Sequence, residues 1–263
     1  MRYAVISDIH ANPSALKAVL KELQDLNVEK LICLGDVVGY GPDASGAIQL
    51  IRGEADVCLM GNHDAAVAAV IGSEGFSLSA VQGIRRHCNE TDVEERQWLA
   101  GLDFVFADGD MACTHGDFVK PEAFNYIRSV DDAIRSLNAR RESVLFVGHT
   151  HKSAVFARNP DGVVQEIDYP EALNLEEGCR YLINVGSVGY PRYEFWSTYC
   201  VYDAEKKAVA FRRMPFDFDG YARELAKQDV SLPSWFEGLR AEARKQRDKD
   251  GRTFWQMLKN IVR

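Results

Sequence analysis

The first half of the chain alternates short apolar runs with amphipathic stretches, the pattern of strands separated by helices. Residues 2–7, 30–34 and 57–60 are apolar runs of strand length. After the first run, a capping asparagine and a proline precede apolar residues at helical spacing: Asn12, Pro13, Leu16, Val19, Leu20, Leu23 and Leu26. A second helix is predicted over 43–52. This order predicts a parallel sheet covered by helices, with ligands beyond the carboxyl ends of its strands.

The second half of the chain predicts mainly strands joined by tight turns. Strand-like segments lie at 103–107, 110–114, 144–148, 153–157, 163–168, 181–185, 198–203 and 207–213. Asp108-Gly109 and Asp161-Gly162 have the composition of hairpin turns, and a helix is expected near 129–138. We expect these strands to form a second, more antiparallel sheet. The predicted fold class is α/β, a four-layer α/β/β/α sandwich of two mixed sheets flanked by helices.

Helices are also predicted before and after this second group of strands. Thr91 followed by Glu94 matches a capping box, which would begin a helix that carries Trp98. From about residue 217 onward the chain is expected to be helical again. Residues 236–263 carry eight basic and four acidic side chains. We interpret them as the solvated face of helices that close the sandwich, with a docking arm for a partner as the alternative.

Composition narrows the class of protein. The chain has 263 residues, 46% of them hydrophobic, and a formal net charge of −8, which predicts no general attraction to nucleic acid or to anionic membranes. The first apolar run is too short for a signal peptide, and no stretch approaches the roughly 20 apolar residues of a membrane span, so a cytoplasmic location is expected. Six scattered cysteines without a CxxC pair predict reduced, mostly buried thiols.

The histidines are distributed in a way that indicates a shared site. Five of the six follow directly after apolar runs, in the contexts AVISDIH, CLMGNHD, MACTHGD and LFVGHTH, and ICLGD ends a further run with an aspartate. A lone histidine after a strand is more often structural than a ligand. Five strand ends that each present oxygen or nitrogen ligands argue against separate structural roles. His87 lacks this setting and is expected to be an ordinary residue.

These side chains form a candidate ligand set for metal ions: Asp8, His10, Asp36, Asn62, His115, His149 and His151. Mixed carboxylate, imidazole and amide ligands suit Mn²⁺, Fe or Zn²⁺ better than Ca²⁺. Seven ligands are too many for one ion, but with a bridging carboxylate they fit two ions about 3.5–4 Å apart. The Asp-x-His and His-x-His spacings favour this interpretation, because residues i and i+2 of an extended chain face the same side.

The motifs DIH, GDVVGYGPD, GNHD, THGD and GHTH, in this order, resemble those of the calcineurin-like metallophosphoesterase superfamily. The later NVGSVGYPR resembles the GSVGxPR signature of its small bacterial and archaeal phosphodiesterase branch. The resemblance implies a metal-dependent phosphohydrolase that cleaves a phosphodiester or phosphomonoester by attack of a metal-bridging hydroxide, without a covalent enzyme intermediate. It implies two divalent ions, with Mn²⁺ favoured and Fe, Ni or Zn as alternatives.

The resemblance also implies a role for each ligand. The first metal would be bound by Asp8, His10 and His151, the second by Asn62, His115 and His149, and Asp36 would bridge them. His63 matches the catalytic imidazole, which stabilises the transition state and protonates the leaving oxygen. Arg192 is a candidate for binding a phosphate oxygen, with a surface ion pair as the alternative. Tyr40 is a candidate for stacking on a base or sugar, with packing as the alternative.

The sequence departs from the family pattern at two places. Many relatives carry an aspartate where this chain has Gly39, so His63 must be oriented otherwise, by Asp64 or not at all. After His115 comes GDFVKPEAFNYI, whereas close relatives often have a shorter HGSP-type loop. This segment is expected to border the substrate pocket, so the specificity of relatives does not transfer to this chain.

The expected organisation is a metallophosphoesterase domain over residues 1–215 and a helical C-terminal extension over 216–263. The expected partner is a small phosphate-ester or nucleotide substrate. The alternative enzymatic function is that of a symmetrical diadenosine tetraphosphatase. A nuclease is disfavoured because the acidic chain lacks a basic groove. A non-catalytic binding scaffold is also considered, but such a protein would be expected to lose ligands, and none is missing here.

Overall fold

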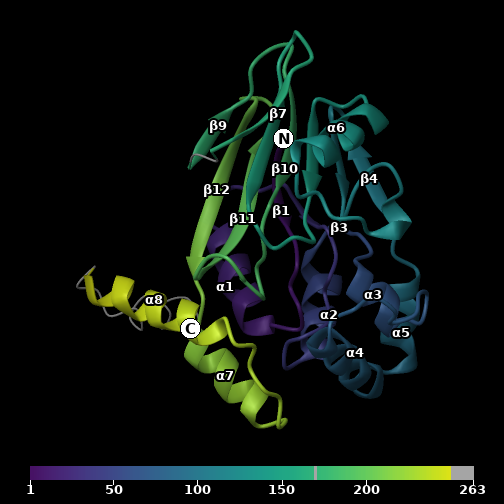
Figure 1. Cartoon of the computed structure of the whole chain (residues 1–263), viewed down its shortest axis with the longest axis vertical. Coiled ribbons are helices and arrows are strands. Elements are labelled where there is room, and N and C mark those ends of the chain that lie inside the picture. Colours follow the sequence, from purple (N-terminus) through teal and green to yellow (C-terminus); the bar gives the residue numbers. More distant parts are fainter. Residues whose placement is uncertain (169–170, 250–263) are drawn as a thin grey trace.

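The computed structural model describes residues 1–168 and 171–249 and contains two six-stranded sheets packed face to face (Figure 1). In spatial order the first sheet consists of β3 (Val57–Cys58), β2 (Lys30–Cys33), β1 (Arg2–Ile6), β11 (Trp196–Asp203), β12 (Ala208–Pro215) and β9 (Ala172–Asn174). The second consists of β4 (Val105–Asp108), β5 (Met111–Thr114), β6 (Val144–Val147), β10 (Arg180–Asn184), β7 (Ala154–Arg158) and β8 (Val164–Ile167).

Helices accompany both sheets and end the described chain. They are α1 (Pro13–Leu23), α2 (Ala44–Glu54), α3 (Asn62–Val67), α4 (Leu78–Glu90), α5 (Val93–Ala100), α6 (Val130–Ala139), α7 (Phe218–Ala226) and α8 (Phe236–Lys249), with a 3₁₀ turn at Pro121–Ala123. Within the described residues, no helix combines the length and the apolar character that crossing a membrane requires.

The layers follow from the alternation of side chains along the strands. On β1, Ile6 packs with Leu16 of α1 and Ile48 of α2, whereas Val5 packs into the core between the sheets. On the far side of the second sheet, Leu145 packs against α6. Because successive side chains of a strand point to opposite faces, each sheet contributes to two cores. The predicted four-layer α/β/β/α sandwich is confirmed.

The predicted assignment of strands to sheets is right for the first half of the chain and wrong for two later strands. β1, β2 and β3 are parallel as predicted, and Gly109 and Gly162 lie in turns of antiparallel pairs. However, β11 and β12 belong to the first sheet, where β11 pairs antiparallel with β1. Tyr199 packs in the helix-facing core and Cys200 in the core between the sheets, so β11 is buried on both faces, as a central strand must be. The short β9 was not predicted.

The start of α5 was predicted one residue too early. Asp92, not Thr91, caps this helix: its carboxylate accepts a hydrogen bond from the Glu95 N–H (2.8 Å), and the Glu95 carboxylate accepts from the Asp92 N–H (3.1 Å). The Thr91 hydroxyl instead donates to the carbonyl of His87 at 2.6 Å and ends α4. All six cysteines are free thiols, three buried and three half-buried.

The chain is helical after β12, as predicted. Arg240 and Arg244 of α8 both donate to the Asp219 carboxylate of α7, at 2.7 and 2.8 Å, so part of the basic face is used in ion pairs between the two helices. Residues 250–263 of the predicted basic arm lie outside the described residues. The division at residue 215 stays a prediction.

Candidate metal centre

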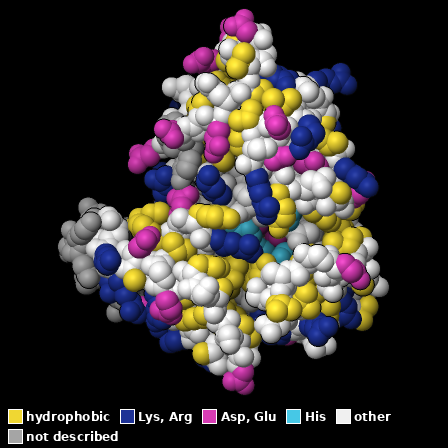
Figure 2. Space-filling model, viewed as in Figure 1, with side chains coloured by type: hydrophobic (Ala, Val, Ile, Leu, Met, Phe, Trp, Pro, Cys, Tyr) yellow, Lys and Arg dark blue, Asp and Glu magenta, His cyan; other side chains and the backbone are white. Residues whose placement is uncertain are grey.

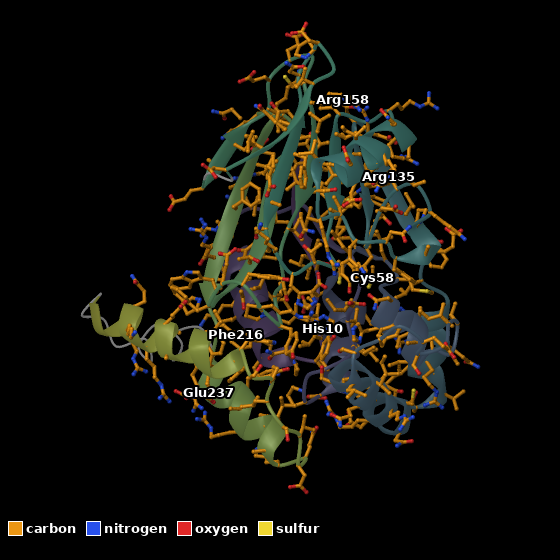
Figure 3. All side chains as sticks on the ribbon, in the orientation of Figure 1. His10, Cys58, Arg135, Arg158, Phe216 and Glu237 are labelled. Atoms are coloured by element: carbon orange, nitrogen blue, oxygen red, sulfur yellow. The ribbon has the colours of Figure 1, made fainter. Side chains whose placement is uncertain are left out.

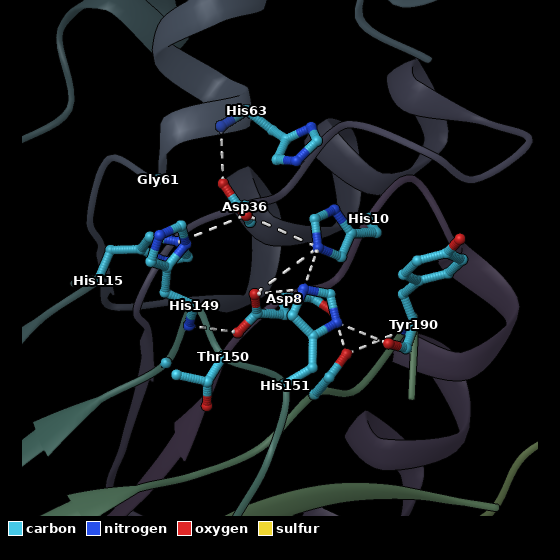
Figure 4. Close-up of polar contacts among 12 residues, drawn as sticks. Asp8, His10, Asp36, Gly61, His63, His115, His149, Thr150, His151 and Tyr190 are labelled. Carbon is cyan, nitrogen blue, oxygen red and sulfur yellow. Dashed lines mark hydrogen bonds and ion pairs between the residues drawn. The ribbon is translucent and has the colours of Figure 1, made fainter. Parts of the chain in front are cut away.

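The predicted ligands converge at one edge of the sandwich, beyond the carboxyl ends of five strands. Asp8 and His10 follow β1, Asp36 follows β2, Asn62 begins α3 after β3, His115 follows β5, and His149 and His151 follow β6. All are buried except Asn62, which is half-buried. Figure 3 places His10 between α7 and the α2–α5 group of helices, and Figure 4 shows the surrounding side chains pointing toward one another.

The backbone of these loops is not extended, which corrects the expectation for the two i, i+2 pairs. Five of the seven predicted ligands have left-handed φ angles: Asp8 55°, His10 47°, Asp36 52°, His149 68° and His151 60°. Non-glycine residues seldom adopt such angles, and the resulting strain persists only where surrounding contacts impose it. The His10 N–H donates to the carbonyl of Asp36 at 2.9 Å, and the His149 N–H donates to Asp8 Oδ2 at 3.0 Å.

The first group of ligand atoms is formed by Asp8, His10 and His151 (Figure 4). His10 Nδ1 lies 3.0 Å from the carbonyl oxygen of Val38, and His151 Nδ1 lies 2.6 Å from that of Tyr190. Because a carbonyl can only accept, each Nδ1 must carry the proton and each Nε2 a lone pair. These two Nε2 atoms are 3.1 Å apart, and Asp8 Oδ1 lies 3.2 Å from that of His151.

The second group is formed by Asp36, His115 and His149. His115 Nδ1 donates to the carbonyl of Leu34 at 3.1 Å, which directs its Nε2 to within 3.2 Å of His149 Nδ1. Asp36 Oδ2 lies 3.3 Å from His115 Nε2 and 3.6 Å from His10 Nε2. Asp36 therefore stands between the two groups, where a single carboxylate can serve both.

The arrangement fits divalent cations. Nitrogen lone pairs that face each other at hydrogen-bond distance repel unless a proton or a cation lies between them. Within the described residues, Asp8 Oδ1 and Asn62 Oδ1 are buried and accept no hydrogen bond, although burying such atoms unpaired is costly. Ring nitrogens that donate to backbone carbonyls are the usual support of metal-binding histidines. The structure therefore brings together donor groups that suit divalent metal ions.

Burial and mutual proximity shift the pKa values of the ligands. Burial lowers the pKa of His149 to about 3, and His115 lowers it further. Burial would raise the pKa of Asp36, but the neighbouring imidazoles of His115 and His63 outweigh it and hold that pKa well below its usual value. For His115, burial lowers the pKa, but Asp36 outweighs it and raises the pKa to about 9. The aspartates are thus ionised, as metal binding requires.

His63 lies against the same cluster, but its ring is not oriented by a carboxylate. The side chain of Asp64 accepts from the N–H groups of Val38 (3.1 Å) and Gly61 (3.0 Å), so the proposed role of Asp64 in orienting His63 is wrong. His63 Nδ1 is buried without a hydrogen-bond partner among the described residues. A Cβ at Gly39 would lie 2.2 Å from it, so the aspartate of relatives does not fit this backbone.

The His63 ring is held by packing instead. Its centroid lies 4.7 Å from that of Tyr40 and 5.2 Å from that of Phe76, which contacts it edge to face. It also lies 4.9 Å from the centroid of His10. Aromatic contacts of this kind restrict a ring without neutralising its polar atoms. The contacts therefore fix the ring against the cluster and leave its buried Nδ1 without a polar partner in the described chain.

His87, expected to be ordinary, supports the loop that carries Tyr40. Its Nδ1 accepts from the Gly39 N–H at 2.9 Å, and its Nε2 donates to the carbonyl of Gly41 at 2.9 Å. Burial lowers its pKa to about 3, so the ring stays neutral. Arg86 donates to the carbonyl of Tyr40 at 2.7 Å.

The predicted substrate residues Tyr40 and Arg192 lie side by side at the centre. The rings of Tyr40 and Tyr190 are stacked, with centroids 4.4 Å apart and planes 8° apart. The Arg192 guanidinium carbon lies 5.0 Å from the first ring centroid and 5.2 Å from the second. No ion pair of Arg192 with a carboxylate is found in the described part of the chain, so the surface ion pair is not what this structure contains. We call Tyr40, Tyr190 and Arg192 the aromatic–arginine wall.

The segment after His115 borders the centre, as expected, and contributes a residue that sequence reasoning missed. The ring of Tyr126 stacks on His149 with centroids 3.8 Å and planes 13° apart. The guanidinium carbon of the exposed Arg128 lies 3.9 Å above the other face of Tyr126. Figure 2 shows histidine atoms at the bottom of a central opening with basic and apolar side chains at its margin.

Comparison with known proteins agrees with this geometry. Residues 1–207 match the model of the calcineurin-like phosphoesterase superfamily domain. An uncharacterized protein of Methanocaldococcus jannaschii is 29% identical over 239 residues, 88% of this chain and 94% of that one. A metallophosphoesterase from Sphaerobacter thermophilus superposes with a TM-score of 0.76 and 29% identity, covering 92% of this chain and 98% of that one. A hypothetical protein from Pyrococcus horikoshii shares the fold, with a TM-score of 0.69, 19% identity and coverage of 90% and 97%.

Proposed function

The chain belongs to the calcineurin-like phosphoesterase superfamily, and from this premise we propose that it is a hydrolase that uses two divalent metal ions to cleave a phosphodiester or phosphomonoester. The observation that carries the proposal is the position of Asp36, which shares one group of possible ligand atoms with His115 and His149 and another with His10 and His63. A single carboxylate between two sets of histidine nitrogens suits two ions that share one ligand. Such a pair would draw charge from a phosphoryl group and lower the pKa of a nearby water molecule.

We assign the ligands from the resemblance to the family, and the distances between the donor atoms support the assignment. One ion would be held by Asp8, His10 and His151, the other by Asn62, His115 and His149, and Asp36 would be shared. Mn²⁺ is favoured, and Fe, Ni or Zn are alternatives, because nitrogen and oxygen donors accept all of these ions and supply decides among them. The six free thiols support a location in the reducing cytoplasm.

The side chains around the ligands would handle the substrate. The ring of His63 lies against that of His10, with centroids 4.9 Å apart, and we assign His63 to hydrogen-bond the phosphoryl group and to protonate the leaving oxygen. Arg192 is a half-buried cation without a carboxylate partner in the described chain, which makes it available for a phosphate oxygen. Tyr40 shapes the pocket by packing on both His63 and Arg192.

The test is turnover of bis-p-nitrophenyl phosphate by the purified protein with Mn²⁺. In Asp36→Asn we expect loss of both turnover and bound metal. In His63→Ala we expect turnover to fall at least about 100-fold with metal retained. Arg141→Ala, an exposed residue at the opposite end of β6, is the matched control and should behave as wild type. Wild-type rates in both site variants would contradict the proposal.

A symmetrical diadenosine tetraphosphatase is the second candidate, favoured by the position of Arg128. Arg128 lies on Tyr126, whose ring stacks on His149, whereas Arg192 lies beside Tyr40, whose ring packs on His63. Two cations beside one centre suit a substrate with more than one phosphate. Release of ADP alone from diadenosine tetraphosphate, with an Arg128→Ala defect confined to that substrate, would select this candidate.

A non-catalytic scaffold is the remaining alternative, and the complete donor set argues against it. Mass spectrometry that finds bound metal, together with no turnover across a broad screen of phosphate esters, would favour the scaffold over both enzymes.

A further inference from the structure

We propose that the C-terminal helices α7 and α8 position the aromatic–arginine wall, so that Trp235 and Gln228 set the affinity of the centre for the phosphoryl group. The inference rests on the proposed function, because it concerns how that site binds phosphate. These helices lie outside residues 1–207, the part that matches the family domain, so their contacts add to what that domain supplies. Trp235 and Gln228 act through other residues and are positioning residues.

The first contact is made by aromatic side chains. The Trp235 ring meets the Tyr190 ring edge to face, with centroids 5.2 Å apart at 75°, and the Tyr221 ring lies 6.2 Å from it. These rings continue into the buried cluster that α7 and α8 form with β12 and the segment around Tyr190: Tyr190, Phe216, Phe218, Tyr221, Leu225 and Phe236. The edge of the wall is thus part of the core of the C-terminal helices.

Tyr190 connects this core to the metal centre in three ways. Its carbonyl accepts from His151 Nδ1 at 2.6 Å, which fixes the ring orientation of a proposed ligand. Its ring stacks on Tyr40 and faces the guanidinium of Arg192. Its own N–H donates to the Ser187 hydroxyl at 3.0 Å, and that hydroxyl donates to the carbonyl of Asp8 at 2.9 Å. The backbone of Tyr190 is thus held by the ligand loops, so loss of support for its ring should be felt at Arg192.

The second contact reaches the other half of the wall. The Gln228 side-chain amide, after α7, donates to the carbonyl of Pro42 at 2.6 Å, two residues beyond Tyr40. The C-terminal helices therefore touch both segments that supply the stacked tyrosines. Tyr40 has independent support from Arg86, which donates to its carbonyl, and from the ring of His63. Tyr190 depends more on the C-terminal helices, so Trp235 should matter more than Gln228.

The expected consequence is a change in binding rather than in the chemical step. A free arginine side chain loses rotamer entropy when it is fixed, and the two rings beside Arg192 restrict it in advance. An arginine that binds the phosphoryl group equally before and during reaction affects KM and not kcat. Loss of the support for Tyr190 should therefore raise KM and weaken phosphate binding.

The experiment measures inorganic phosphate affinity by calorimetry and bis-p-nitrophenyl phosphate kinetics on the Mn²⁺-loaded full chain. We expect Trp235→Ala to raise the Kd for phosphate and the KM about tenfold, with bound metal and kcat within about twofold of wild type. Trp235→Phe should recover most of the affinity, and Gln228→Ala should raise both constants about twofold. Trp98→Ala is the matched control. Trp98 of α5 is also partly buried, and its ring lies near Arg52 of α2.

A double-mutant cycle separates this role from general destabilisation. If Trp235 acts through the wall, Trp235→Ala should change phosphate affinity by less than about twofold once Arg192→Ala is present. Multiplicative losses, or an unchanged Kd and KM in folded Trp235→Ala, would overturn the inference. If Trp235→Ala does not fold, the phosphate Kd and the KM of Trp235→Phe and Gln228→Ala test the inference. Wild-type values of both constants in both variants would contradict it. Absence of wild-type turnover would refute the proposed function alone, because the phosphate Kd still tests Trp235.

Discussion

The ligand cluster and the aromatic–arginine wall lie against each other but are built in different ways. The cluster comes from residues that each follow a strand directly, so the sheets bring its donors to one edge. The wall comes from two loops and is held by α4 and by the C-terminal helices, through His87, Arg86 and Trp235. The cluster is thus determined by topology and the wall by packing between distant segments. Substitutions in the cluster should therefore cause loss of metal, whereas substitutions in the wall should lower the affinity for substrate.

Removal of metal should have the largest effect. We expect a chelator to reduce turnover by at least about 1,000-fold, because charge neutralisation and nucleophile activation both depend on the ions. It should also lower the melting temperature, since ions that bind only the folded state stabilise it. Activity assays and thermal melts before and after re-addition of Mn²⁺ check this. Full activity in the metal-free protein would show that the cluster does not act through bound metal, and would contradict this prediction.

Loss of the Arg192 side chain should have the next largest effect and should leave metal binding unchanged. We expect Arg192→Ala to raise KM for bis-p-nitrophenyl phosphate about 30-fold, because a charge-assisted hydrogen bond to phosphate is lost. Arg192→Lys should recover only part of this, since lysine has a point charge and lacks the planar face that lies beside Tyr40 and Tyr190. Steady-state kinetics with parallel metal analysis measure both. Metal loss in these variants would show that wall and cluster are not separable.

His87, which supports the wall, should make the free energy of unfolding of the protein depend on pH. Its pKa is about 3 in the folded protein, below the ordinary value of 6.5, so the unfolded chain binds the proton more readily between these values. The stabilisation is complete above pH 6.5 and is lost as the pH falls toward 3. Relative to His87→Gln, the wild type should lose about 1.4 kcal/mol more per pH unit between pH 6 and 4. Urea unfolding at several pH values measures this, and parallel slopes would contradict it.

The smallest effect is expected at Tyr126. Replacement by leucine keeps apolar contact with His149 but removes the stacked ring, and with it the aromatic face that Arg128 contacts. We expect Tyr126→Leu to raise KM about threefold for a substrate with several phosphates and to leave bis-p-nitrophenyl phosphate unaffected. Competition kinetics with the two substrates in one reaction would resolve a difference of this size. Equal effects on both substrates would count against a separate contact for additional phosphates.

The sequence allowed the layers and the candidate ligands to be predicted because both depend on local patterns. Asp8, Asp36 and His115 each follow an apolar run, and parallel strands place their carboxyl ends at one edge. The left-handed backbone at these positions was not predictable, because it depends on contacts such as that of the His149 N–H with Asp8. The same is true of β11, which joins the first sheet through a partner almost 200 residues away.

The wall shows where sequence patterns become insufficient. His87 and Tyr126 have no neighbouring motif, and their roles depend on contacts with Gly39 and His149, which lie 48 and 23 residues away in the sequence. Gly39 was recognised as a departure from relatives, but only the backbone shows that a Cβ there would collide with His63. Side chains that act through packing are specified by the three-dimensional environment, and local sequence carries little of that information.

If Asp36 joins two metal sites, the number of metal ions bound per chain must depend on its carboxylate. Mass spectrometry of the native protein reconstituted with Mn²⁺ should find two ions in the wild type and in Arg192→Ala. Asp36→Asn should hold fewer than two, because the carboxylate that lies within 3.6 Å of both His10 and His115 nitrogens is lost. A wild type that binds one ion or none at saturating Mn²⁺, or an Asp36→Asn protein that keeps two, would contradict the account.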